Sequence, residues 1–424
     1  MIHYNTLGNN LKRNILRFSE KVTQGFSKPT RKFIADMIYG IIASNSCTLT
    51  KIGRALKESI SLKKVVDRLS RNLANFTEQD ALMDNYLASV RPSFGKDTML
   101  LIDGGDVAKP CSPKMESIGS VYDASAKTFA DGYWTMGAVA LSEENQQPIP
   151  VYENLYPCKE QGGLGFSVET SKCLQYLREN FDSSIPRVFD RGFDSGALIL
   201  ELVEKSEMFI LRANQNRVAV HKGKRSKIND IVSGIACEDE LIFKSKTGNI
   251  STSRIGMTQI TLSKLENIKL NLVVCKEFGD TPLVLYTNIT ETLENIALRV
   301  VKAYLMRWRI EEYYAFKKQG LDFEGFRVRG LHSIKTLDLL LTIACGYIGM
   351  LCEKSDTEIV FGLISISKRI QKIGYYLEKT KFFYYAVLSG ITQVVATLRC
   401  GISHFFEPES RNPQLCFPGF QKMG

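Results

Sequence analysis

A short apolar run and a second strand-like stretch, each ending in an aspartate, constrain the fold of this chain more than any other feature. Thr98–Ile102 leads into Asp103, and Pro186–Phe189 leads into Asp190. Short apolar runs that stop at an acid are typical of buried central strands, because both faces of such a strand are covered. The pattern therefore predicts a sheet whose strands bring both carboxylates to one edge.

The segments around these runs predict an α/β arrangement. Apolar or alternating patterns predict further strands at 133–141, 149–153 and 208–212, and helical spacing predicts helices at 169–181 and 195–205. Residues 213–290 differ, since they hold short β-patterned runs separated by Gly, Asn and Ser. We expect an antiparallel, β-rich insertion there, followed by a helix from about residue 291.

The stretch from Tyr304 to Lys318 carries four polar side chains on one helical face. At 100° per residue, Tyr304, Arg307, Glu311 and Lys318 fall within an arc of about 60°. A carboxylate between two cations can bind a hard divalent metal ion while the cations hold phosphate oxygens beside it. A solvated face with ordinary ion pairs, such as Arg307 with Glu311, would give the same pattern.

Asp103, Asp190 and Glu311 are far apart in the sequence, but the predicted topology brings them to one edge of one sheet. Three hard oxygen donors there could bind two divalent metal ions, one activating a water or 3′ hydroxyl and one stabilising the leaving oxygen. An acid at a strand end is more often a loop starter or a helix cap, so neither aspartate alone indicates a site. Together with the helix, the three acids are predicted to be catalytic and metal-binding.

The positive charge is concentrated near the N-terminus. Residues 1–95 hold 15 Lys or Arg and 7 Asp or Glu, so they carry +8 of the total net charge of +10. A polyanion is the expected partner, because neutralised phosphates release counterions. The sequence pattern of this region predicts helices and no strands. Four basic residues lie on the outer face of the helix predicted at 62–73, and we expect them to contact DNA: Lys63, Lys64, Arg68 and Arg71. A helical bundle with a basic surface would look much the same.

Composition indicates where the protein is located and which metal or disulfide sites it lacks. The sequence has no run of 18 apolar residues and no signal-like N-terminus, so we expect neither membrane spanning nor export, and a cytoplasmic location. Ten cysteines are scattered without a Cys-x-x-Cys pair, which disfavours a zinc site or a disulfide framework. After residue 330 the pattern predicts apolar helices at about 333–353, 357–375 and 379–400.

With these motifs in place, the chain resembles insertion-sequence transposases of the Asp-Asp-Glu superfamily. The signature Tyr-x2-Arg-x3-Glu-x6-Lys of one branch stands complete as Tyr304, Arg307, Glu311 and Lys318. The first and second aspartates of the family's triad match Asp103 and Asp190. The resemblance covers about residues 96–350, and the N-terminal helices share only its general character.

The resemblance implies a ribonuclease H-like catalytic core interrupted by a β-rich insertion. The regions expected are a basic helical DNA-binding region (1–95), the first part of the core (96–212), the insertion (213–290), the core helix with the signature (291–330) and a C-terminal helical region (331–424). It also implies Mg²⁺, with Mn²⁺ as a substitute, and cleavage and joining of double-stranded DNA at the element's terminal inverted repeats and a target. Tyr304, Arg307 and Lys318 would contact DNA. A homodimer would form in the synaptic complex, at the bacterial nucleoid.

One departure leaves the cutting of the second strand open. Relatives that use a DNA hairpin place an aromatic residue, typically Trp, in the insertion, whereas the tryptophans here are Trp134 and Trp308. Phe209 or Phe243 could substitute, and Trp308 is expected to pack in the core.

Three rival functions share some of these features. A non-catalytic DNA-binding derivative and a metal-dependent nuclease on the same fold stay open. A glycoside hydrolase with two carboxylates is disfavoured, because Arg307 and Lys318 would oppose the raised pKa that a general acid needs.

Overall fold

The fold described here is that of a computed structural model. It describes residues 4–402, apart from 124–125, 158–164, 245–249, 263–264, 266–267, 291–294, 354–357 and 372–381. By its internal contacts the chain forms two compact units. Unit 1 comprises residues 1–89, 317–379 and 383–424, and unit 2 comprises residues 90–316 and 380–382. Each unit is described by itself.

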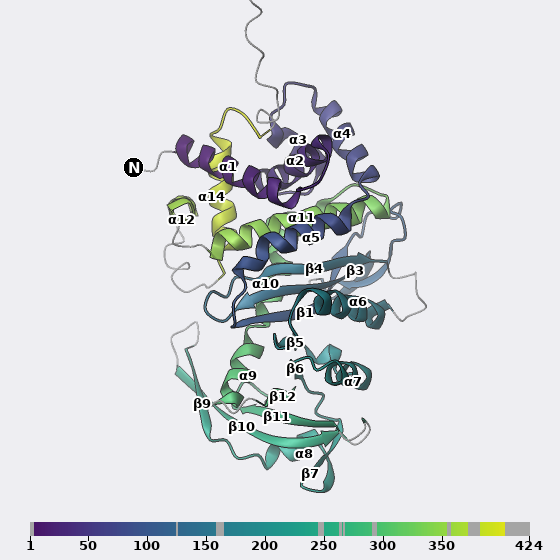
Figure 1. Ribbon diagram of the computed structural model, residues 1–424, viewed down its shortest axis with the longest axis vertical. Coiled ribbons are helices and arrows are strands. Elements are labelled where there is room, and N and C mark those ends of the chain that lie inside the picture. Colours follow the sequence, from purple (N-terminus) through teal and green to yellow (C-terminus); the bar gives the residue numbers. More distant parts are fainter. Residues whose placement is uncertain are drawn as a thin grey trace, which may run out of the picture. The chain divides into compact units, whose positions relative to one another are not determined.

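Unit 2 is built on one mixed sheet, so the fold is of the mixed α/β kind (Figure 1). Among the described residues the strands follow the order β2-β3-β1-β5-β6-β12-β11-β10-β7-β8, with β4 beside β3 and β9 beside β10. The strands of the first half are β1 (Thr98–Ala108), β2 (Gly119–Asp123), β3 (Thr128–Ser142), β4 (Ile149–Tyr156), β5 (Arg187–Phe189) and β6 (Phe209–Arg212).

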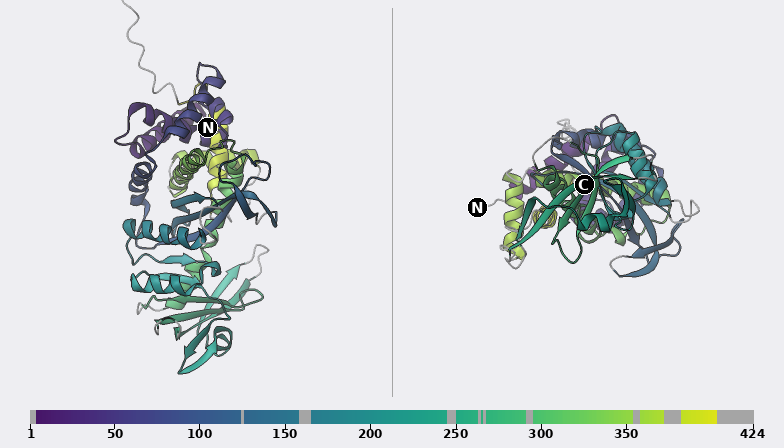
Figure 2. Two further views of the ribbon diagram at one scale, coloured as in Figure 1. Left: turned by 90° about the vertical axis from the view of Figure 1, so that its right-hand side faces the viewer. Right: turned by 90° about the horizontal axis from the view of Figure 1, so that it is seen from below.

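Helices α6 (Gly165–Asn180) and α7 (Gly196–Glu204) connect β4 to β5 and β5 to β6. Figure 2 (left) shows both helices along one side of the sheet. Their apolar residues, such as Leu174 and Ile199, are fully buried. The strands and helices predicted for 96–212 are therefore present, whereas β2, the early starts of β3 and α6 and the full length of β1 were not predicted.

The centre of the sheet is parallel. β1 pairs with β5 through Leu100–Ile102, and β5 pairs with β6, whereas β1 pairs with β3 in antiparallel fashion along its whole length. β1 therefore does not stop at Asp103 as expected but continues to Ala108. Only its parallel pairing ends at Ile102, because β5 ends at Phe189.

The expected insertion extends this same sheet instead of forming a separate one. Strand β12 pairs antiparallel with β6, and β11 and β10 follow outward from it. The elements of this half are β7 (Val218–His221), β8 (Lys224–Lys227), α8 (Ile228–Ser233), β9 (Asp239–Lys244), β10 (Ile250–Leu262), β11 (Ile268–Lys276) and β12 (Leu283–Thr287). Strand β8 and helix α8 were not anticipated from the sequence.

The stretch predicted as one helix from about residue 291 is divided into three segments. α9 (Ile296–Leu305) begins after Asn295, and α10 (Trp308–Ala315) follows a turn at Met306–Arg307. In that turn the Arg307 and Arg309 amides donate to carbonyls three residues back instead of four. A π-helical turn, Phe316–Gly320, ends the stretch. The 60° arc, which assumes one straight helix, is therefore not the geometry observed.

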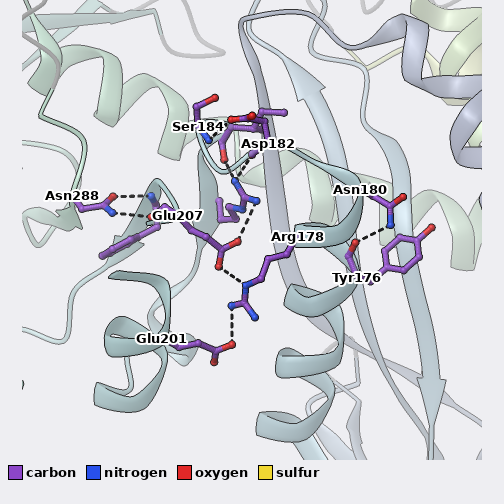
Figure 3. Close-up of polar contacts among 11 residues, drawn as sticks. Tyr176, Arg178, Asn180, Asp182, Ser184, Glu201, Glu207 and Asn288 are labelled. Atoms are coloured by element: carbon purple, nitrogen blue, oxygen red, sulfur yellow. Dashed lines mark hydrogen bonds and ion pairs between the residues drawn. The ribbon is translucent and has the colours of Figure 1, made fainter. Parts of the chain in front are cut away.

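A network of charges, two of them buried, anchors the strand that precedes Asp190 at its other end (Figure 3). Arg187 at the start of β5 is fully buried; its guanidinium donates to the Asp182 carbonyl (2.8 Å) and lies 3.1 Å from the Glu207 carboxylate. Arg178 on α6 reaches both Glu207 (2.9 Å) and Glu201 (2.7 Å). Ion pairs of this kind hold a three-residue strand in place, because removing one partner would leave the other charge without a counter-ion.

Unit 1 is helical. Its helices are α1 (Tyr4–Val22), α2 (Lys28–Ser44), α3 (Leu49–Leu56), α4 (Leu62–Asn75), α5 (Gln79–Val90), α11 (Leu331–Glu353), α12 (Glu358–Gln371) and α14 (Tyr384–Ala396). The N-terminal helices pack on α11 and α14, as contacts of α2 with both helices show. Gly346 of α11 lies so close to Tyr86 of α5 that a Cβ would stand 1.9 Å from the tyrosine oxygen.

Helix α11 is long and apolar enough to cross a membrane by length and composition. However, 83% of its most apolar window is buried inside the structure. Buried residues such as Leu340, Ile343 and Tyr347 cover several sides of it, which is what a central helix of a bundle requires.

Candidate active site

Strand register places three charged side chains next to one another in unit 2. Ile102 pairs with Phe189, and Phe189 pairs with Leu211, so the next residues are Asp103, Asp190 and Arg212. Neighbouring strands lie about 4.8 Å apart, which makes these residues successive neighbours across the sheet. Arg212 Nη1 lies 3.9 Å from Asp190 Oδ1.

Arg307 joins the first aspartate to the glutamate. Its Nη1 donates to Asp103 Oδ2 (2.9 Å), and its Nη2 donates to Glu311 Oε1. The guanidinium is only 12% exposed, against 20% for Asp103 and 34% for Glu311. Its position at the break between α9 and α10 is what allows one side chain to face both carboxylates.

Tyr304 joins the second aspartate to the same cluster. Its hydroxyl donates to Asp190 Oδ1 (3.1 Å), and the ring is buried. Burial, followed by the charge of Asp190, raises the pKa of Tyr304 to about 12, so the phenol stays protonated at neutral pH. Tyr304 is thus a hydrogen-bond donor that orients Asp190.

The acids of this cluster repel one another. Burial raises the pKa of Asp103 to about 6, with smaller contributions from Asp190 and Glu311, while Arg307 lowers it. For Arg307, burial opposes the charged form, but Asp103 and Asp190 outweigh it and raise the pKa above its ordinary value. The cluster therefore concentrates negative charge that one guanidinium partly compensates.

Tyr314 supports the backbone of Asp103 and was not anticipated from the sequence. Its hydroxyl donates to the Asp103 carbonyl (2.8 Å). The ring packs over Gly105 and Gly137, and a Cβ on Gly137 would lie 2.5 Å from the tyrosine oxygen. Gly137 is the partner of Asp103 in the β1–β3 register. The glycine thus admits the side chain that fixes α10 against β1.

We expect Gly137→Ala to disturb this contact. Because the new methyl group overlaps the Tyr314 oxygen, the variant should lose about 1–3 kcal/mol of unfolding free energy, measured by denaturant titration. Adding Tyr314→Phe removes the oxygen and leaves the next ring atom at 3.3 Å, so the double variant should regain part of the loss. Unchanged stability of Gly137→Ala would show that the Tyr314 packing is not restrictive.

Two candidates for the third acid were adjacent in the sequence, and only one joins the cluster. Glu311 contacts Arg307, whereas Glu312 forms an ion pair with Arg309. Arg309 in turn donates to Gln146 Oε1 (3.2 Å). Of these two glutamates, Glu311 is therefore the one that shares Arg307 with Asp103.

Lys318 and the N-terminal basic residues belong to unit 1. Lys318 lies in the π-helical turn and forms an ion pair with Glu324 (3.2 Å). Arg68 is engaged by Asp36 (3.1 Å) and Glu58 (2.8 Å), two carboxylates that are 1% and 8% exposed. This pairing explains Arg68 as a structural cation of unit 1. The other predicted DNA contacts on α4, Lys63, Lys64 and Arg71, are exposed.

The tryptophan beside Arg307 differs from the expectation. Trp308 is 61% exposed and does not pack in the core, because it is the first residue of α10 after the break in the helix. Of the other aromatic candidates, Phe209 is buried in β6, and the side chain of Phe243 lies outside the described residues.

The donor set fits Mg²⁺ in its chemistry, since it consists of carboxylate oxygens. Within the described part of the chain, however, no three His, Cys, Asp or Glu side chains gather closely enough to hold a metal ion. Asp103 and Glu311 do not meet because the Nη groups of Arg307 lie between their carboxylates. A metal ion at these residues requires the guanidinium to move.

Comparison with known proteins gives distant similarities. No family model matches the chain. The structure is similar to a chain in the cryo-EM structure of the piggyBac transposase synaptic complex with hairpin DNA, at a TM-score of 0.43 and 9% sequence identity, covering 95% of this chain and 80% of that chain. It is also similar to the NurA nuclease from Sulfolobus solfataricus, at a TM-score of 0.25 and 10% identity, covering 59% of this chain and 86% of that chain. Because both TM-scores are below 0.5, a function is proposed from the residues of the site alone.

Proposed function

We propose that this protein is a metal-dependent DNA transposase, which nicks the terminal inverted repeats of an insertion sequence and transfers the 3′ ends to target DNA. The observation that carries the proposal is the cluster in which Arg307 links Asp103 to Glu311 while Tyr304 holds Asp190. Three of the four signature residues thus meet the two strand-end aspartates. Lys318, in unit 1, is proposed as a further DNA contact.

The chemistry proposed for the site follows from these residues. Asp103, Asp190 and Glu311 would hold Mg²⁺ or Mn²⁺, which supplies activation of the attacking oxygen and stabilisation of the leaving oxygen. Arg307, once it leaves the carboxylates, is a planar donor suited to a phosphate. Arg212 lies beside Asp190 and can hold another phosphate oxygen. Tyr304 keeps Asp190 oriented throughout.

The sheet supports the proposal of a ribonuclease H-like core. Strands β4, β3 and β1 run antiparallel, β5 and β6 continue parallel to β1, and the acids lie where the parallel pairing ends. A position between elements of an α/β sheet, outside the carboxyl ends of its parallel strands, is where such sheets usually bind ligands. We further propose that two copies act together on two DNA ends, in the cytoplasm at the nucleoid.

The decisive experiment is an assay with the purified chain and DNA that carries the inverted repeats flanking its gene. We expect nicks at the repeat ends with Mg²⁺ or Mn²⁺, none with EDTA, and joined products when target DNA is added. Nicking without joining would instead identify a nuclease, and DNA binding without either product would identify a non-catalytic derivative.

A further inference from the structure

The strongest concentration of uncompensated charge outside the candidate active site lies on the hairpin formed by β7 and β8. Four exposed cations occupy six successive positions at and after its turn: Lys222, Lys224, Arg225 and Lys227. The only acid between residues 217 and 237 is Asp230. Within the described residues none of the four forms an ion pair, in contrast to Arg254, which pairs with Glu277. We propose that this hairpin is a contact surface for B-form duplex DNA.

The backbone of the hairpin is defined by its turn and by its contact with β10. Lys222 and Gly223 both have positive φ, 49° and 78°, as a two-residue type I′ turn requires. His221 hydrogen-bonds to Thr258 on β10 (3.0 Å), and Ala219 is fully buried. A backbone defined in this way loses little conformational entropy when it binds.

Register shows which face of the hairpin is available. Arg225 and Lys227 lie opposite Val220 and Val218, two residues apart on one face, and Val218 is 39% exposed. The opposite face carries the buried Ala219. An outward face with two cations, next to a turn with a third at Lys222, is a two-stranded ribbon of the kind that the major groove of B-form DNA admits.

The base of the hairpin is joined to the loop that follows the second catalytic aspartate. Arg217, immediately before β7, forms an ion pair with Asp194, which is 1% exposed and lies four residues after Asp190. Asp194 also accepts a hydrogen bond from the Asn214 amide (2.6 Å). The base of the hairpin is therefore attached to the loop that follows Asp190, and this inference rests on the proposed function for its choice of DNA.

Sheet geometry bounds the distance between the hairpin and the acids. β8 is six strands away from β5 in the sheet order, which corresponds to about 29 Å along a flat sheet and less along a curled one. At 3.4 Å per base pair this equals about nine base pairs. Counted across the strands alone, the hairpin thus lies about one helical turn of DNA from β5.

Charge on an edge strand has another use, since lysines there prevent sheets from pairing edge to edge. That use requires no DNA. The two roles are separable, because a purely protective hairpin would change the solubility of a variant and leave the affinity of its monomers for DNA unchanged.

The test compares two variants with the same change in charge. One carries Lys222→Gln, Lys224→Gln, Arg225→Gln and Lys227→Gln, and the control carries Lys96→Gln, Lys114→Gln, Lys205→Gln and Lys269→Gln, at exposed positions scattered over unit 2. Affinity for a labelled 30-base-pair duplex is measured on monomeric fractions, without metal, from 50 to 200 mM NaCl. Four phosphate contacts add about 3.6 to the salt slope. Over this range the wild type should lose about 100-fold more affinity than the hairpin variant.

The outcomes separate this proposal from the proposed function. Equal slopes for wild type and hairpin variant, or an equal drop in the control, would overturn the hairpin proposal even if the wild type nicks DNA. The same loss on duplex RNA, or stronger capture by anionic vesicles than by DNA, would also overturn it. A selective drop in the hairpin variant supports it, even if the wild type proves unable to nick.

Discussion

Glu311→Ala should lower the rate of metal-dependent nicking by at least about 10³-fold, and Glu312→Ala should leave it within a few-fold of wild type. The two residues are adjacent on α10, but only Glu311 shares Arg307 with Asp103. Asp103→Ala and Asp190→Ala should lower the nicking rate as much as Glu311→Ala does, because the three carboxylates act together. The measurement is single-turnover cleavage of a labelled repeat end, at about pH 8 and roughly 5 mM Mg²⁺.

The matched pair guards against a simple folding defect. Both glutamates are partly exposed, at 34% and 28%, and each pairs with an arginine on its own segment. Far-UV circular dichroism and thermal unfolding should therefore change little in either variant. If Glu312→Ala abolished nicking and Glu311→Ala did not, the assignment of the third acid would be wrong.

Removing Arg307 is expected to have opposite effects on metal binding and on cleavage. Arg307→Ala takes away the cation that lies between Asp103 and Glu311, so Mn²⁺ should bind about 10-fold more tightly, equivalent to about 1.4 kcal/mol. Nicking should nevertheless fall by about 10²–10³-fold, because the donor for the phosphate is lost. Calorimetric titration of Mn²⁺ with wild type and variant measures the first effect.

Arg309→Ala is the control for this experiment, since Arg309 pairs with Glu312 outside the cluster. The same loss of one charge should there alter Mn²⁺ affinity little. Weaker binding of Mn²⁺ by Arg307→Ala would show that the guanidinium supports the carboxylates and is not their exchangeable counter-ion.

The neighbouring positions of Asp103 and Asp190 were predictable, because both end apolar runs typical of central strands and such strands pair in parallel. Arg212 also ends a predicted strand, but its relation to Asp190 depends on the pairing of β5 with β6, which the sequence pattern does not specify. Tyr314 was missed for a similar reason. Its role rests on the absence of a side chain at Gly137, on a strand more than 170 residues away.

The helical projection grouped four residues, of which Tyr304, Arg307 and Glu311 share contacts with the aspartates, whereas Lys318 lies in unit 1 and pairs with Glu324. It assumed one continuous helix, whereas the turn at Met306–Arg307 lets Arg307 face two carboxylates. The pattern likewise missed β8, since Lys-Arg-Ser-Lys has no alternation of apolar residues and becomes a strand only by pairing with β7. Arg68 was expected to face outward, but it pairs with the buried acids Asp36 and Glu58, which come from outside its own helix.

The pairing of β12 with β6 means that the insertion cannot be treated as a removable module. Tyr286 of β12 lies beside Leu211 of β6, and both are fully buried. Deleting residues 213–290 would turn β6 from an interior strand into an open edge with unpaired backbone groups, one strand away from Asp190. A chain shortened in this way should associate through that edge. The solubility of the intact chain therefore depends on the same strands that complete the sheet.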